Sequence, residues 1–193
     1  MTAESVGPGR RTFRLVADRT VVADDHEALD PAHEREILVR RRGRGRLWGV
    51  KAAILVESLT GNTWKAAETT ADLLQQERWT ITGLSKVRQP DHAAIQAADV
   101  VLVGSWVHGA FVFGQAPWAV NSISNLPAMR GKKAAAFCTF ALDPGKSLDK
   151  LTSAVGDTGA YVIGGLAISR SKLEEHSELF ASRLVDALAS SGA

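Results

Sequence analysis

The chain has 193 residues, enough to bury the core of one ordinary domain, and its 45% hydrophobic and 23% charged residues are typical of a globular protein in water. No apolar run approaches the roughly 18 residues that a membrane-spanning helix needs, and the N-terminus, rich in Arg, Asp and Glu, lacks the apolar centre of a secretory signal. The single cysteine, Cys138, excludes an internal disulfide and a cysteine-cluster metal site, so we expect a cytoplasmic protein without a bound metal.

The formal net charge of +2 arises entirely in residues 1–49, which differ in character from the rest of the chain. They contain ten Arg and no Lys, against four Asp and four Glu, whereas residues 50–193 contain as many basic as acidic residues. They offer one plausible strand, from Thr12 to Val22, and an arginine run at residues 40–46. We expect an N-terminal extension, residues 1–49, that is a poorly ordered tail. The alternatives are an arm that binds nucleic acid or a partner, and an artefact of gene-start assignment with Val50 as the true start.

From residue 50 onward, apolar strands alternate with amphipathic helices. In chain order, the pattern predicts a strand over Lys51–Glu57, a helix over Thr63–Glu77, a strand over Trp79–Leu84 and a short helix over Asp91–Ala98. It then predicts a β-branched strand over Val100–Gly104, a helix over Pro117–Asn125 and a strand over Lys133–Phe137. The last predicted elements are a helix over Ser147–Val155, a strand over Tyr161–Ile168 and a helix over Lys172–Ala189. This alternation predicts an α/β fold with a doubly wound parallel sheet and helices on both faces.

A loop rich in hydroxyl and amide side chains follows the first predicted strand and opens the first helix. It reads Ser58-Leu59-Thr60-Gly61-Asn62-Thr63. In a doubly wound sheet, ligands collect at the carboxyl ends of the strands. The free N–H groups and the positive dipole end of a helix attract an anion there, so we expect this loop to bind a phosphate. The competing interpretation is an ordinary turn with a threonine N-cap.

Four other site motifs of α/β folds do not fit the sequence. A dinucleotide loop requires G-x-G-x-x-G, but Gly61 is the loop's one glycine. A Walker loop matches only at Gly145-Lys146-Ser147, because Phe140 stands where its leading glycine belongs. A hydrolase elbow requires glycines two residues before and after Ser105, where valines stand. A receiver domain requires an aspartate at the end of the third strand, where Gly104 and Ser105 stand.

The loop from Ser58 to Thr63 matches the pattern S/T-x-T-G-x-T in full and resembles the FMN-phosphate loop of the flavodoxin family. Residues 50–193 resemble a short-chain flavodoxin from end to end. The resemblance implies a flavodoxin-like five-stranded parallel sheet of order 2-1-3-4-5, with FMN as the cofactor. It also implies that hydroxyls and main-chain N–H groups hold the phosphate without any Lys or Arg, as a fixed set of donors can.

The resemblance places a second loop, after the third strand, against the flavin ring. Its candidate residues are Ser105, Trp106, His108 and Gly109. The family's spacing assigns the stacking aromatic to His108 and the peptide that turns toward the flavin to Gly109. Trp106 is the alternative stacking residue, because an indole offers more flat area than an imidazole.

A third loop, after the fourth strand, contains the candidates Thr139, Phe140 and Asp143. The family usually has a tyrosine here that stacks on the opposite flavin face, and Phe140 is its nearest substitute. The main-chain N–H groups from Thr139 to Asp143 are expected to bind the pyrimidine edge of the flavin.

The resemblance implies a one-electron carrier that docks to redox partner proteins, a reductase and an acceptor that the sequence does not identify. One alternative is an enzyme, either an NAD(P)H-dependent FMN quinone reductase or a protoporphyrinogen oxidase-like flavoenzyme. Another is a module that keeps the fold without a flavin. Short loops and an uninterrupted fifth strand favour the carrier, since the enzymes tend to carry insertions. We expect neither nucleic acid nor membrane as a partner.

Overall fold

A computed structural model describes residues 13–14, 49–108, 116–117 and 120–189 of the chain. The predicted N-terminal extension, residues 1–49, lies almost wholly outside these ranges, so its interpretation stays a prediction. Of the strand expected from Thr12 to Val22, only β1 (Phe13–Arg14) is described, and it pairs in parallel with Gly164 and Gly165.

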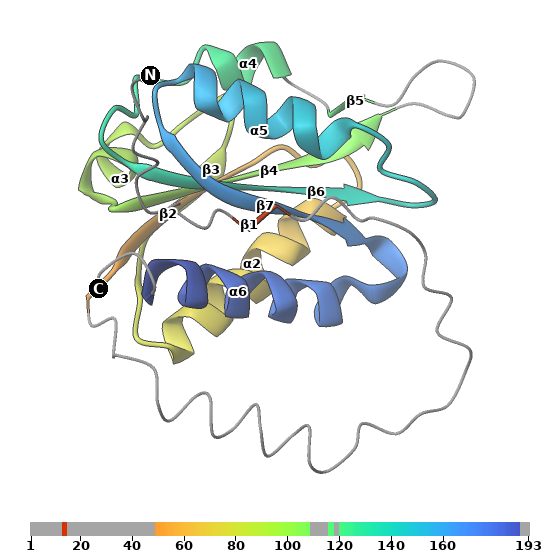
Figure 1. Ribbon diagram of the computed structural model, residues 1–193, viewed down its shortest axis with the longest axis horizontal. Coiled ribbons are helices and arrows are strands. Elements are labelled where there is room, and N and C mark those ends of the chain that lie inside the picture. Colours follow the sequence, from red (N-terminus) through yellow and green to blue (C-terminus); the bar gives the residue numbers. More distant parts are fainter. Residues whose placement is uncertain (1–12, 15–48, 109–115, 118–119, 190–193) are drawn as a thin grey trace, which may run out of the picture.

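The centre of the fold is a parallel sheet, as the sequence predicted (Figure 1). Its five main strands are β2 (Lys51–Val56), β3 (Thr80–Lys86), β4 (Val100–His108), β6 (Lys133–Phe140) and β7 (Tyr161–Ser169). They lie side by side in the order β3-β2-β4-β6-β7, which is the expected order 2-1-3-4-5. The short β1 extends the sheet beyond β7, and β5 (Ala116–Pro117) pairs antiparallel with β4.

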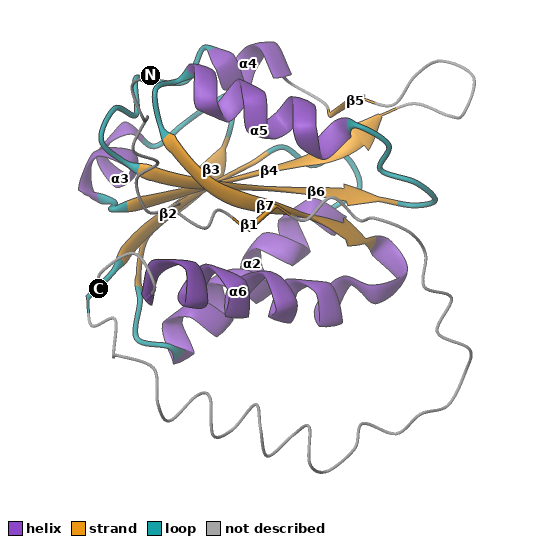
Figure 2. Ribbon diagram, viewed as in Figure 1, coloured by secondary structure: helices purple, strands orange, loops and turns teal. Residues whose placement is uncertain are grey.

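Helices cover both faces of this sheet (Figure 2). One face carries α2 (Asn62–Gln76) and α6 (Leu173–Ala189), the latter entered through the 3-10 turn η1 (Arg170–Lys172). The other face carries α3 (His92–Ala97), α4 (Val120–Ser124) and α5 (Ser147–Asp157). Among the described residues, no helix has the length and apolar character needed to span a bilayer.

The alternation of side chains along each strand builds two separate cores. In β2, Ile54 and Val56 pack beneath α2 and α6, whereas Ala53 and Leu55 pack beneath the helices of the opposite face. All four are buried, which explains why the strand is apolar without interruption.

Two strands are longer than predicted. β4 ends at His108 instead of Gly104, and β6 ends at Phe140 instead of Phe137. The extensions contain polar residues, which made them look like loops, but the two strands continue to pair as far as Trp106 and Thr139. Of the helix expected at residues 117–125, the structure describes α4 at 120–124, while Pro117 lies in β5. The remaining ends differ from prediction by one or two residues, as helix and strand ends commonly do.

Candidate functional site

The carboxyl ends of β2, β4 and β6 meet at one edge of the sheet, on the right in Figure 1. The strand order reverses between β2 and β4, which is where doubly wound sheets bind ligands. The main-chain N–H of Glu57 donates to the carbonyl oxygen of Gly104 at 2.8 Å and so ties the ends of these two strands together. The loop after β2 therefore starts from a fixed position at the expected binding edge.

This loop folds back on itself through its own polar side chains. Gly61 adopts φ 86° and ψ −18°, in the left-handed region, and its N–H donates to Ser58 Oγ at 3.1 Å. The Asn62 side chain donates from Nδ2 to Thr60 Oγ1 at 3.0 Å. The hydroxyl oxygens of Ser58 and Thr60 are thus acceptors in these bonds, so the hydroxyl protons are left to donate to another group.

The first turn of α2 has neither a side-chain cap nor an acidic residue, and its N-cap is Gly61. The first N–H groups of any helix lack acceptors within it, and the dipole makes this end positive. Thr60 and Gly61 are exposed. The N-cap threonine considered as the ordinary interpretation of the sequence is therefore absent from this helix start.

A buried contact joins this helix start to the end of β6. Thr63 Oγ1 lies 2.7 Å from Thr139 Oγ1, and the two residues are 1% and 0% exposed. Both threonines were predicted site residues, but nothing in the sequence predicted that they touch. The signal that could have suggested it is the meeting of strand ends in a parallel sheet, combined with two hydroxyls at those ends.

The predicted residues after the third strand lie in the extended β4. Ser105 is wholly buried, and its hydroxyl donates to the Trp106 carbonyl oxygen at 3.4 Å. Trp106 is half-buried, pairs with Thr139 across the strands and lies by alternation on the α2 face. The main chain of His108 pairs with that of Ala116. Gly109 lies outside the described residues. β4 thus includes the first four residues of the predicted loop, and the stacking roles remain predictions.

The third predicted loop likewise begins later than expected, at Ala141. Phe140 ends β6 and packs partly against the core beneath α4 and α5. Asp143 is exposed, and its Oδ1 accepts the N–H of Gly145 at 3.0 Å, which closes a tight turn before α5. The structure therefore brings Thr139, but not Phe140, to the side of the sheet where α2 begins.

The one cysteine takes no part in this site. Cys138 is fully buried beneath the opposite face, and burial raises the pKa of its thiol to about 12. The thiol is therefore protonated at physiological pH and has no nucleophilic role. The side chain therefore serves as a small apolar residue of the core.

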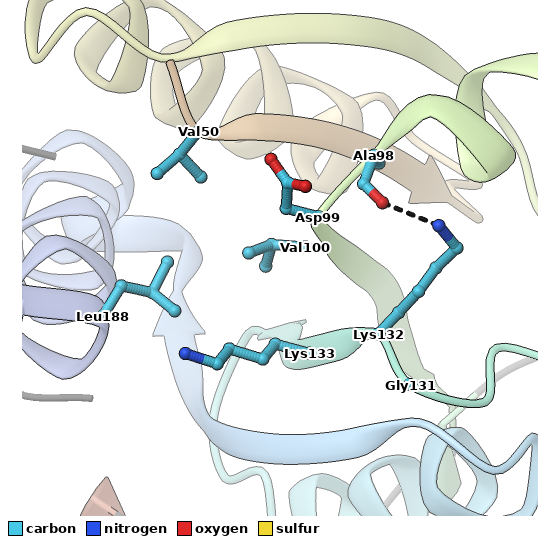
Figure 3. Close-up of a pocket in the computed structure, with 8 residues that line it drawn as sticks. All are labelled: Val50, Ala98, Asp99, Val100, Gly131, Lys132, Lys133 and Leu188. Carbon is cyan, nitrogen blue, oxygen red and sulfur yellow. Dashed lines mark hydrogen bonds between the residues drawn. The ribbon is translucent and has the colours of Figure 1, made fainter. Parts of the chain in front are cut away.

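A cavity of about 460 Å³ lies at the opposite, amino-terminal edge of the sheet (Figure 3). It is lined by Val50, Ala98, Asp99, Val100, Gly131, Lys132, Lys133 and Leu188. The Asp99 carboxylate accepts the main-chain N–H of Lys51 at 2.9 Å, and Lys132 Nζ donates to the Ala98 carbonyl oxygen at 2.7 Å. These two polar side chains of the cavity therefore bond to the main chain. Because doubly wound sheets bind ligands at the carboxyl ends of their strands, we place the candidate site at that edge.

Comparison with known proteins gives the family of this fold. The sequence model described as flavodoxin domain matches residues 53–162, more than half of the chain. Similar solved structures include oxidised Flavodoxin 2 from Bacillus cereus, with 22% identity, a TM-score of 0.56 and coverage of 74% of this chain and 99% of that one. They also include the Streptococcus pneumonia TIGR4 flavodoxin, with 20% identity, a TM-score of 0.56 and coverage of 71% and 99%. At such identities these structures show a shared fold only, and no curated protein matches the chain. The family match and the sheet order together establish that the chain belongs to the flavodoxin family.

Proposed function

We propose that the protein binds FMN at the carboxyl edge of its sheet and carries electrons between redox partner proteins. The observation that carries this proposal is the hydroxyl loop at the start of α2, a helix without a side-chain cap or an acidic first turn. Such a start offers donors to an anion and nothing that competes with it. Because the chain belongs to the flavodoxin family, the phosphate group of FMN is the anion that best fits this helix start.

The residues fit the phosphate group of FMN. Ser58 and Thr60 keep their hydroxyl protons while accepting bonds inside the loop, and the N–H groups of the first helical turn lie beside them. Residues 58–64 contain no Lys or Arg. The phosphate would be held by neutral, oriented donors, which suffices for a dianion when several converge.

When bound, FMN supplies the redox chemistry, taking up and releasing one or two electrons. The part of this chain is to fix the cofactor. The loop and first turn of α2 would hold its phosphate, and the contact between Thr63 and Thr139 fixes that turn against β6. Trp106, the neighbour of Thr139 on β4, is the described aromatic side chain best situated to lie against the ring.

Two features favour a carrier over an enzyme. β7 runs unbroken from Tyr161 to Ser169, without the insertion that would build a substrate pocket. Leu59 and Leu142, on the loops after β2 and β6, are 70% and 78% exposed. Exposed leucines on both sides of the proposed flavin site offer apolar contact to a docking protein, as the centres of protein interfaces do.

The proposal is tested by the colour and flavin binding of the purified protein. We expect a yellow protein, or an apoprotein that quenches the fluorescence of added FMN at micromolar concentration. Riboflavin, which lacks the phosphate, should bind much more weakly if the hydroxyl loop provides the main contact. A folded, colourless protein that leaves FMN fluorescence unchanged would overturn the proposal.

Stopped-flow mixing with NADPH separates the carrier from the enzyme. A carrier should be reduced slowly by NADPH alone and rapidly once a flavodoxin reductase is added. Rapid direct reduction, followed by transfer to a quinone, would instead support the quinone reductase.

A further inference from the structure

The buried pair of Thr63 and Thr139 has two hydroxyl protons, but only one of them lies in the hydrogen bond between the two side chains. Each threonine hydroxyl carries a single proton, and the 2.7 Å contact between the two oxygens consumes only one. Within the described part of the chain, neither hydroxyl has a further hydrogen-bond partner. The second proton therefore lacks an acceptor, although the two residues are at most 1% exposed. A buried donor without an acceptor is costly, so an acceptor from outside the described residues is expected.

The positions of the two residues decide which proton is spare. If Thr63 donated to Thr139, the spare proton would sit on Thr139, which is 0% exposed and lies on β6 between the paired strands β4 and β7. If Thr139 donates to Thr63, the spare proton sits on the second residue of α2, the last position of the hydroxyl loop. Only the second arrangement leaves the proton beside the proposed phosphate.

We propose that Thr139 is a positioning residue for the phosphate, and this proposal rests on the proposed FMN function. Its hydroxyl donates to Thr63 Oγ1 and so commits the Thr63 proton to the phosphate. Without the Thr139 hydroxyl, the hydroxyl group of Thr63 can rotate about its Cβ–Oγ1 bond, and its proton has no fixed direction. The sequence led us to expect a role for the main chain of Thr139 at the flavin ring, whereas this inference assigns its side chain to the opposite end of the cofactor.

The test compares two ligands and two substitutions at the same position. Thr139→Val keeps the shape of the side chain and removes the hydroxyl, while Thr139→Ser restores it. Thr139→Val should weaken FMN binding by about tenfold, as expected for loss of one hydrogen bond of a charged group, and leave riboflavin binding unchanged within about twofold. Thr139→Ser should bind FMN close to the wild-type affinity. The phosphorus NMR shift of bound FMN should move in the valine variant only.

Thr70→Val is the matched control. Thr70 is also fully buried and lies on α2, but its hydroxyl donates to the Ala66 carbonyl oxygen at 2.8 Å, away from the loop. This variant should bind both flavins as the wild type does. If Thr139→Val binds FMN normally, or weakens FMN and riboflavin equally, the positioning role is wrong while FMN binding stands. If the wild type binds no FMN, the proposed function fails and this inference fails with it.

Discussion

Replacing Gly61 by alanine tests whether the shape of the hydroxyl loop serves phosphate binding. A Cβ at this position would meet no atom within 4 Å, so the substitution adds no steric clash with the rest of the protein. What it adds is the local strain of a left-handed conformation at φ 86°. For a residue with a side chain, that strain is about 1–2 kcal/mol.

The strain can affect either the stability of the apoprotein or its affinity for FMN, and the contacts that hold the loop decide between the two. Gly61 is exposed, and the loop is held by short-range bonds to Ser58 and Thr60. In the apoprotein, the alanine variant can relax by leaving the left-handed region at small cost. Binding the phosphate would restore the original shape, so most of the strain appears as lost affinity. We expect FMN to bind about five- to thirtyfold more weakly, since each 1.4 kcal/mol corresponds to about a factor of ten.

Gly131 provides the matched control for this measurement. It has φ 80°, and its Cβ would also meet nothing within 4 Å, but it lies at the opposite edge of the sheet. Gly131→Ala should lower the free energy of unfolding by about 1–2 kcal/mol and leave FMN affinity unchanged. The assays are fluorescence titration with FMN and urea denaturation of the apoprotein. Equal FMN affinity in wild type and Gly61→Ala, or equal losses in both variants, would refute the reasoning.

Three further predictions concern stability and reactivity. Gly104→Ala should lower the free energy of unfolding by about 1–3 kcal/mol in urea denaturation, because a Cβ would overlap the ring of Phe137; unchanged stability would contradict this packing. His176 Nδ1 accepts the N–H of Ser169 at 3.1 Å, and burial lowers its pKa below the ordinary 6.5. Since the folded state favours the neutral imidazole, His176 contributes its full stabilisation to the free energy of unfolding above pH 6.5, and this stabilisation is lost as the pH falls below 6.5. His176→Gln should remove this loss from pH-dependent denaturation curves. Cys138, with its pKa raised to about 12 by burial, should react with Ellman's reagent only after unfolding, and rapid reaction of the native protein would show that the strand end opens.

The sequence predicts most of this fold because its signals are local. Five apolar runs and the intervening helical patterns are each contained in a short window, and the hydroxyl loop is six contiguous residues. The loop and the phosphate that it is proposed to bind could therefore be inferred from the order of the residues alone. The sheet order is different, because no local pattern specifies it and it was expected only from the resemblance to the flavodoxin family.

What the sequence does not predict depends on residues that are far apart. The ends of β4 and β6 carry Ser105 and Thr139, which resemble loop residues until the pairing of the two strands is seen to include them. A register shift between Ala134 and Ala135 places Ile163 and Leu166, three residues apart, on the same face of the sheet. No local period contains either feature, because both arise from pairing between strands.

The register of β6 connects the core to the site. Phe137 packs beneath α2 and α6, 5.4 Å between ring centroids from Phe180, and Thr139 lies two residues further along the same face. A shift of one residue would place Cys138 and Phe140 on that face, and no hydroxyl would reach Thr63. The apolar packing that holds the register therefore also holds the hydroxyl in place. Because side chains alternate strictly in a strand, the proposed phosphate site depends on the core packing that sets this register.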